Sequence, residues 1–239
     1  MSNIVPAVLP SSRKELEGKL ALIAKATSAS RVQIEVVDGH VATPTSWPYV
    51  VPGELHAMVE RGEMLPLLDR FEYEVDLMCT DIEQAVEDWL ALGATRLTFH
   101  FEGMTDPLRL LAKMRRQYGS DPLSTTGVVS LGLAIDLATD LARVEPCLTH
   151  VSYVQCMGIA TIGRQGAPFD ARVLGKVREL HTRHPDLELQ VDGGVSIENA
   201  KSVLMAGASF LVVGSAILGA SDPTSAFLAL ESCKSPYGV

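Results

Sequence analysis

Residues Glu72–Phe101, EYEVDLMCTDIEQAVEDWLALGATRLTFHF, contain two short apolar strands on either side of a helical segment. In each strand apolar residues alternate with polar ones, which is the period of a β-strand. The segment between them opens on Thr80-Asp81-Ile82-Glu83, a pattern typical of a capping box at a helix start. A strand, a helix and a second strand in this order predict two parallel neighbours in one sheet.

The same alternation of strands and helical segments extends over the whole chain. Besides 72–78 and 96–101, strands are expected at residues 4–8, 32–37, 128–135, 149–155, 187–191 and 210–213. Eight strand–helix units favour closure into a (β/α)8 TIM barrel. We therefore predict a single-domain barrel over residues 1–239, a length that barrels reach undivided. An open doubly wound sheet is the alternative, and the lack of a GxGxxG after the first strand disfavours it.

The composition excludes several classes of function. The net charge is −9 without a cluster of lysines and arginines, which argues against nucleic acid as a partner. No apolar run is long enough to span a bilayer, and the N-terminus lacks signal-peptide regions. A cytoplasmic protein with no membrane partner is therefore expected. The four cysteines form no CxxC pair and no zinc-ligand spacing, which indicates reduced thiols.

The polar side chains of the strands are predicted to point into the barrel. Gln33 and Glu35 share one face of the second strand, whereas aliphatic residues fill the other, and apolar side chains should meet the helices. Residues near the strand starts are expected to be either rim residues in water or satisfied hydrogen-bonding groups of the interior, namely Glu74, Glu188 and Gln190. Residues nearest the carboxyl ends, where barrel enzymes carry out chemistry, are Glu35, Asp76, His100, Glu102 and Asp192.

Glu35, Asp76 and Asp192 are interpreted as functional, because ionised groups are rarely buried without a partner. Three carboxylates in one mouth cannot all remain ionised and unpaired. Either a divalent cation neutralises them, or one of them holds a proton at neutral pH through like-charge repulsion. Both outcomes suit proton-transfer chemistry.

Two glycine turns follow the last two strands. Such turns let backbone amides approach an anion, and barrels commonly hold a substrate phosphate at this place. We predict phosphate binding by Gly193, Gly194, Gly214 and Ser215, with ordinary turn glycines as the alternative. The glycine-rich segment 158–169 is expected to form a mobile lid. Arg164 in this segment reaches either the phosphate or solvent.

No lysine lies at the end of a predicted strand, since all fall in helical segments or in the C-terminal tail. This argues against Schiff-base aldolases and against decarboxylases of the Asp-x-Lys-x-x-Asp type. Cys79 and Cys156 lie near strand ends, but no partner histidine can be assigned to either, so they are expected to be buried thiols. Of the chemistries considered, proton transfer by carboxylates is the one that the residues still favour.

Several segments carry a family resemblance over almost the whole chain. They are VPAVLPSS (5–12), VQIEVVDGHV (32–41), residues 73–103, LGLAIDLAT (131–139), PFDARVLGKVREL (168–180) and VDGGVSIENAKSVLMAGASFLVVGSAI (191–217). By their order and spacing, the chain resembles the ribulose-phosphate 3-epimerase family. The resemblance implies a TIM barrel that interconverts D-ribulose 5-phosphate and D-xylulose 5-phosphate. It also implies two acids acting on opposite faces of C3 and a divalent metal that stabilises the enediolate.

The resemblance is incomplete at the metal site. Where the family has His-x-Asp on the second strand, this chain has Gln33 and Glu35, and Asp76 replaces a histidine on the third. Asp192 keeps the family's fourth metal-binding position and its second catalytic acid. The metal ligands implied are therefore Glu35, Asp76, Asp192 and Gln33. Their oxygen donors favour Mg²⁺ or Mn²⁺ over Zn²⁺.

We interpret the chain as a phosphosugar isomerase, a ribulose-5-phosphate 3-epimerase or a close relative, with Glu35 and Asp192 as the catalytic pair. The alternatives are a non-catalytic phosphosugar-binding barrel and an epimerase for another ketose phosphate, such as a hexulose 6-phosphate. A homo-oligomer is expected. The substrate pocket is expected to include His40 and Met78, which match the family, and His100, for which a hydrogen bond to Glu102 is the alternative.

Overall fold

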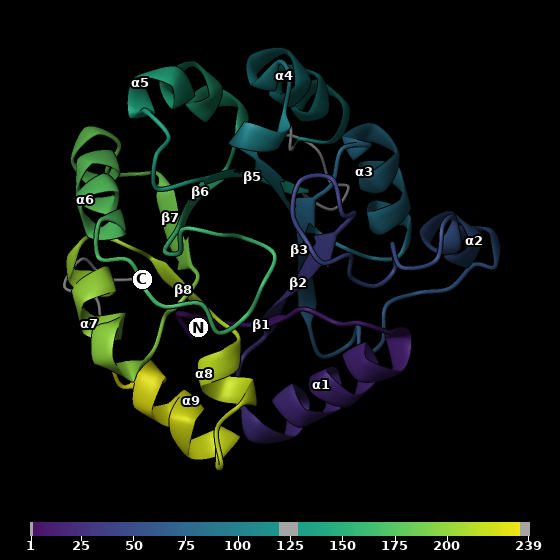
Figure 1. Ribbon diagram of the computed structural model, residues 1–239, viewed down its shortest axis with the longest axis horizontal. Coiled ribbons are helices and arrows are strands. Elements are labelled where there is room, and N and C mark those ends of the chain that lie inside the picture. Colours follow the sequence, from purple (N-terminus) through teal and green to yellow (C-terminus); the bar gives the residue numbers. More distant parts are fainter. Residues whose placement is uncertain (1, 120–128, 235–239) are drawn as a thin grey trace.

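A computed structural model describes residues 2–119 and 129–234 of the protein. Within these ranges eight parallel strands close into a barrel in sequence order, with β8 pairing back to β1 (Figure 1). The predicted single-domain TIM barrel is confirmed. The strands are β1 Ile4–Val8, β2 Arg31–Val37, β3 Glu72–Met78, β4 Arg96–His100, β5 Ser130–Ile135, β6 Tyr153–Met157, β7 Glu188–Asp192 and β8 Phe210–Val213.

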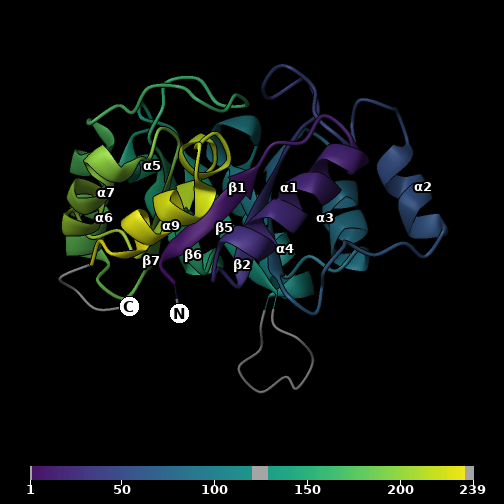
Figure 2. The same ribbon diagram turned by 90° about the horizontal axis from the view of Figure 1, so that it is seen from below.

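Helices surround the barrel, and the loops that follow β2 and β6 rise at the same end (Figure 2). The α-helices are α1 Arg13–Ala26, α2 Glu54–Glu60, α3 Ile82–Ala91, α4 Pro107–Tyr118, α5 Leu141–Val144, α6 Val173–Arg183, α7 Ile197–Met205, α8 Ser215–Leu218 and α9 Pro223–Glu231. The 3-10 helices are η1 Phe101–Gly103 and η2 Glu145–His150. None of the helices in the described ranges is long and apolar enough to cross a membrane.

The main core lies between the strands and the helix layer. Ile34 of β2, Leu16 of α1 and Trp89 of α3 are fully buried members of it. The opposite strand face carries the polar side chains, as the alternation predicts, and Gln33 and Glu74 are completely buried inside the barrel. Polar groups at such depth must find hydrogen-bond partners, and these partners determine the layers below the mouth.

Several predictions about the ends of elements are wrong. The strand at 96–101 ends at His100, because Phe101 enters η1, so Glu102 leaves the inward face and is exposed. The strand at 149–155 starts late, because η2 occupies its first residues. Helix α3 starts at Ile82 without a side-chain cap, since Thr80 instead donates to Asp38 Oδ2 at 2.9 Å. The strand at 187–191 shifts by one residue and thereby includes Asp192. The predicted start at 128 lies outside the described residues.

Candidate active site

The carboxyl ends of the strands enclose a cavity at the barrel mouth. Glu35, Asp76 and Asp192 line it from β2, β3 and β7. The β2–β3 register sets Glu35 beside Asp76, and both lie on the inward face because side chains alternate along each strand. The carboxylates that the sequence predicts at the mouth therefore face the same space.

The cavity is narrow because the loop 158–172, between β6 and α6, crosses over the mouth (Figure 1). The centre of a water molecule can reach about 30 Å³ of it, which is room for about two waters. Gln165 of this loop donates from Nε2 to Glu35 Oε1 and to the Ala7 carbonyl oxygen, both at 3.2 Å. A ligand of the size of a sugar therefore requires the loop to move.

Glu35 is a buried acid with an exposure of 7%. Burial, helped by the negative charge of Asp76, raises the pKa of Glu35 from 4.5 to about 7, although the hydrogen bond from Gln165 opposes the shift. Near neutral pH this side chain is present both as a carboxylate and as a carboxylic acid. It can therefore accept or deliver a proton.

Asp192 has the same exposure and the same kind of environment. Burial raises its pKa well above the ordinary value, and the charges of Glu35 and Asp76 add to this, while a hydrogen bond from the Gly193 backbone amide opposes it. Repulsion among the three groups favours a proton on at least one of them, which was one of the two outcomes predicted from the sequence.

Asp76 is completely buried and hydrogen-bonded at both oxygens. His100 Nε2 lies 2.9 Å from Oδ1, and Gln155 Nε2 donates to Oδ2 at 3.2 Å. Burial works to lower the pKa of His100, but the Asp76 carboxylate, together with the charges of Asp136 and Glu102, outweighs burial and raises that pKa. The alternative for His100, a hydrogen bond to Glu102, is wrong, since its ring pairs with Asp76 instead.

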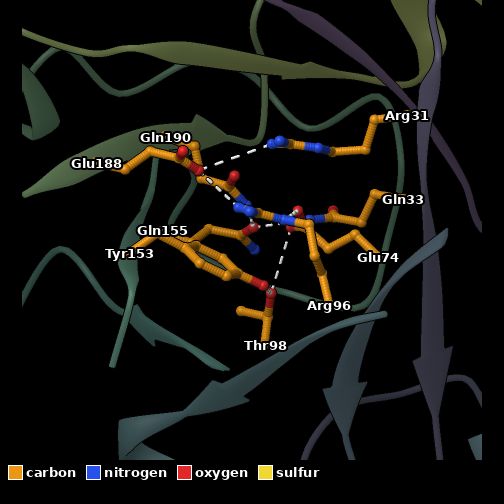
Figure 3. Close-up of polar contacts among 9 residues, drawn as sticks. All are labelled: Arg31, Gln33, Glu74, Arg96, Thr98, Tyr153, Gln155, Glu188 and Gln190. Carbon is orange, nitrogen blue, oxygen red and sulfur yellow. Dashed lines mark hydrogen bonds and ion pairs between the residues drawn. The ribbon is translucent and has the colours of Figure 1, made fainter. Parts of the chain in front are cut away.

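A polar layer of glutamine and glutamate side chains lies directly below the mouth (Figure 3). Gln33 Nε2 donates to Glu74 Oε1 and to Gln155 Oε1, both at 2.7 Å. Gln190 Nε2 donates to the same two acceptors. Arg96 Nε donates to Glu74 Oε2 at 2.9 Å, and its guanidinium lies 4.0 Å from the centre of the Tyr153 ring. The interior role predicted for Glu74 and Gln190 fits these contacts, and Gln33 belongs to the same layer.

The three mouth carboxylates do not fit a metal centre in their present arrangement. Among the described residues, one group of three has ligand atoms that all lie within 4.8 Å of one another, and it consists of His100, Glu102 and Asp136. Both oxygens of Asp76 are already hydrogen-bonded. The ligand set Glu35, Asp76, Asp192 and Gln33 therefore stays a prediction, while the structure brings together a different set.

The glycine turns after β7 and β8 also line the mouth cavity, as do Ser215 and Met78. Gly193 and Gly194 have φ angles of 101° and 68°, which strain any residue with a side chain. A Cβ on Gly194 would also lie 2.6 Å from the backbone of Phe169. The turns therefore allow a ligand to approach the backbone closely, and phosphate binding by them stays a prediction.

Arg164 lines the cavity too, but its Nε donates to the Thr43 carbonyl oxygen at 3.3 Å.

A second cavity lies beside the first, at the ends of β4 and β5. His40 and His100 line it together with Glu102 and Asp136. Of the three residues predicted in the substrate pocket, Met78 thus faces the carboxylate cavity, whereas His40 and His100 face its neighbour.

Three functional positions were missed by the sequence reasoning. Gln155 shares the inward face of β6 with Tyr153 and alternates with Val154 and Cys156 of the outer core, so its inward position could have been predicted from strand periodicity. Asp136 directly follows β5, as a strand-end signal would require. No pattern in the lid sequence indicates that Gln165 contacts Glu35. Two lysines also reach loops at the mouth from their helices, Lys19 at the Leu9 carbonyl oxygen and Lys176 at that of Thr139.

The chain matches the sequence model of the "Ribulose-phosphate 3 epimerase family" over residues 3–218. It belongs to the ribulose-phosphate 3 epimerase family. The match runs from just before β1 to the end of α8 and so contains the whole candidate site. The predicted family resemblance is confirmed.

Curated epimerases agree with this membership, and a solved barrel agrees with the fold. The chain is 28% identical to the ribulose-phosphate 3-epimerase of Candida glabrata over 230 residues, 92% of this chain and 87% of the relative. It is 29% identical to that of Escherichia coli (strain K12) over 224 residues, 92% and 90% of the two chains. It also superposes on the 3-hexulose-6-phosphate synthase from Salmonella typhimurium with a TM-score of 0.64, 17% identity and 98% coverage of both chains. At this identity the last likeness shows the fold alone.

This epimerase-family member thus has a mouth of acids and amides. Gln33, Glu35 and Asp76 stand where the family resemblance implies two histidines and an aspartate, and the structure places Gln33 a layer below the other two. The histidine that contacts this site is His100, which pairs with Asp76 and comes from β4.

Proposed function

We propose that this protein is a ketose-phosphate 3-epimerase with D-ribulose 5-phosphate as its substrate and Glu35 and Asp192 as its catalytic pair. One observation carries the proposal. In a barrel of the epimerase family, these two buried carboxyl groups with raised pKa values face one cavity at the mouth. Groups that titrate near the working pH are the most effective proton donors and acceptors.

The reaction is two proton transfers at C3. The ionised member of the pair takes the C3 proton. The electron pair of the broken C–H bond forms the C2–C3 double bond, and the π electrons of the C2 carbonyl move to its oxygen, which gives an enediolate. The protonated member then delivers its proton to the opposite face of C3 as the C2 carbonyl reforms, which inverts the configuration. Each turnover thus exchanges the protonation states of Glu35 and Asp192, and the reverse reaction restores them.

The phosphate of the sugar is assigned to the glycine turns after β7 and β8. Gly193, Gly194, Gly214 and Ser215 line the same cavity as the two acids. Backbone amides in such turns hold phosphate without a cationic side chain, which agrees with the net charge of −9. The sugar would then lie between the phosphate end and the acids, under the loop 158–172.

The proton transfers are assigned to the carboxylates alone. For the metal that the family resemblance implies, oxygen donors at its positions favour Mg²⁺ or Mn²⁺ over Zn²⁺. Among the described residues, these donors are not gathered around one point.

Solvent exchange at C3 tests the function directly. Ribulose 5-phosphate is incubated with the protein in D₂O, with and without Mn²⁺, and deuterium at C3 is followed by NMR together with formation of xylulose 5-phosphate. We expect both signals to rise in proportion to protein concentration. If C3 exchanges neither with nor without Mn²⁺, the assignment is contradicted.

The two alternatives predict different results, which deuterium exchange and thermal unfolding distinguish. A hexulose 6-phosphate that exchanges faster than ribulose 5-phosphate would identify a different ketose phosphate as the substrate. A non-catalytic barrel would show thermal stabilisation by ribulose 5-phosphate without deuterium incorporation. In that case Glu35→Gln would leave ligand binding unchanged.

A further inference from the structure

A histidine and two acids meet at the wall of the second cavity. His100 ends β4, Glu102 lies in η1 and Asp136 directly follows β5. One possible ligand atom from each lies within 4.8 Å of the other two. Their clustering follows from the β4–β5 pairing, which sets His100 beside Ala134 and brings the two strand ends together.

The ring of His100 has one nitrogen in use and one without a partner. Its exposure is 2%, and Nε2 lies 2.9 Å from Asp76 Oδ1. Nδ1 is buried and makes no hydrogen bond, although the residue lines the cavity. A buried polar atom without a partner is rare and costs stability, so Nδ1 is available for a ligand.

The two acids of the cluster also retain free oxygens. Asp136 Oδ1 is buried without a hydrogen-bond partner. Glu102 Oε1 accepts from the Asp136 backbone amide at 3.1 Å and from the Thr139 hydroxyl, which leaves Oε2. Lys176 lies close, but its ammonium donates to the carbonyl oxygens of Asp136 and Thr139. In residues 2–119 and 129–234, neither acid forms an ion pair with a lysine or an arginine.

We propose that His100 Nδ1 and the carboxylates of Glu102 and Asp136 bind one divalent transition-metal cation at the wall of the second cavity. An imidazole nitrogen with two carboxylates is a donor set that suits Mn²⁺ or Zn²⁺, and three protein ligands leave coordination positions open to the cavity. The charge of the cation offsets two acids that are otherwise unpaired. The site lies on β4 and β5, away from the β2, β3 and β7 positions that the family resemblance implies.

Asp76 orients the ring of His100 in this site. A histidine that binds a metal through one ring nitrogen usually donates the other N–H to a carboxylate, which fixes the tautomer. The contact between His100 Nε2 and Asp76 Oδ1 has this arrangement. A cation at Nδ1 would therefore keep Asp76 an acceptor, and Asp76 also lines the cavity of Glu35 and Asp192. Cation binding does not depend on the proposed epimerase activity and can be measured without sugar.

Titration of the metal-free full chain with Mn²⁺, followed by EPR, tests the site. We expect one ion per chain with a dissociation constant below about 1 mM, the weak end for protein cation sites. Pulsed EPR should show coupling to one imidazole nitrogen, which disappears in His100→Gln. Glu102→Gln and Asp136→Asn should each weaken binding by about 100-fold or more, since even residues behind the ligands change metal affinity by about 10–100-fold.

Two control variants make the result decisive. Asp140→Asn changes a nearby exposed acid that caps α5 and should leave Mn²⁺ binding unchanged, as should Glu35→Gln. Glu102 is exposed, so Glu102→Gln keeps the test valid if His100→Gln fails to fold. The proposal is overturned if no ion binds, or if Glu35→Gln abolishes binding and Asp136→Asn does not.

Discussion

Glu35 and Asp192 have raised pKa values for the same reason, which is burial together with the charges of neighbouring acids. The effect on stability has a definite sign. Because the folded-state pKa of Glu35, about 7, lies above its ordinary value of 4.5, the folded protein binds this proton more tightly than the unfolded chain. The resulting stabilisation is fully present below about pH 4.5 and is lost as the pH rises through about 7.

Glu35→Gln should therefore be more favourable for stability at high pH than at low pH. Glutamine cannot ionise, so the variant escapes the cost of a buried charge, which is at most about 3 kcal/mol for a shift of this size. Urea unfolding at about pH 5 and about pH 8 measures the difference between variant and wild type. Glu198→Gln, at an exposed position, is the matched control. An equal difference at both pH values would show that Glu35 does not carry a raised pKa.

At the scale of elements, β3 and β4 hold a buried ion pair that organises the layer below the mouth. Glu74 accepts hydrogen bonds from Gln33, Gln190 and Arg96, so three strands besides its own converge on one carboxylate. Arg96 also reaches Glu188 Oε1 at 2.6 Å, and Figure 3 shows these side chains in contact. The layer supports Gln155, which in turn hydrogen-bonds to Asp76.

Arg96→Met should destabilise the fold by about 3–5 kcal/mol, because it leaves the Glu74 charge buried without its partner. Adding Glu74→Gln removes that charge and should recover most of the loss. Denaturant unfolding of the single and double variants measures both effects. Lys113→Met, which breaks an exposed pair with Glu83, should cost less than about 1 kcal/mol. A double variant as unstable as Arg96→Met would contradict this description of the layer.

For the whole molecule, periodicity was enough to predict the barrel and the inward face of its polar residues. Glu35, Asp76 and Asp192 reach one cavity because parallel strands end at the same edge. The hydrogen-bond partner of each polar side chain could not be predicted from the sequence. Whether His100 contacts Glu102 or Asp76 depends on where β4 ends, and a 3-10 turn decided that. Gln165 reaches Glu35 through a loop whose path has no periodic signal.

The central claim is that Glu35 and Asp192 act on opposite faces of C3, and isotope loss from each epimer tests it most directly. C3-deuterated ribulose 5-phosphate and C3-deuterated xylulose 5-phosphate are incubated separately in H₂O with wild type, Glu35→Gln and Asp192→Asn. Wild type should wash the label out of both. Each variant should keep the wild-type rate of deuterium loss from one epimer and slow the loss from the other by about 100-fold or more. The epimer that is slowed should differ between the two variants. Equal wash-out from both epimers in either variant would contradict the claim.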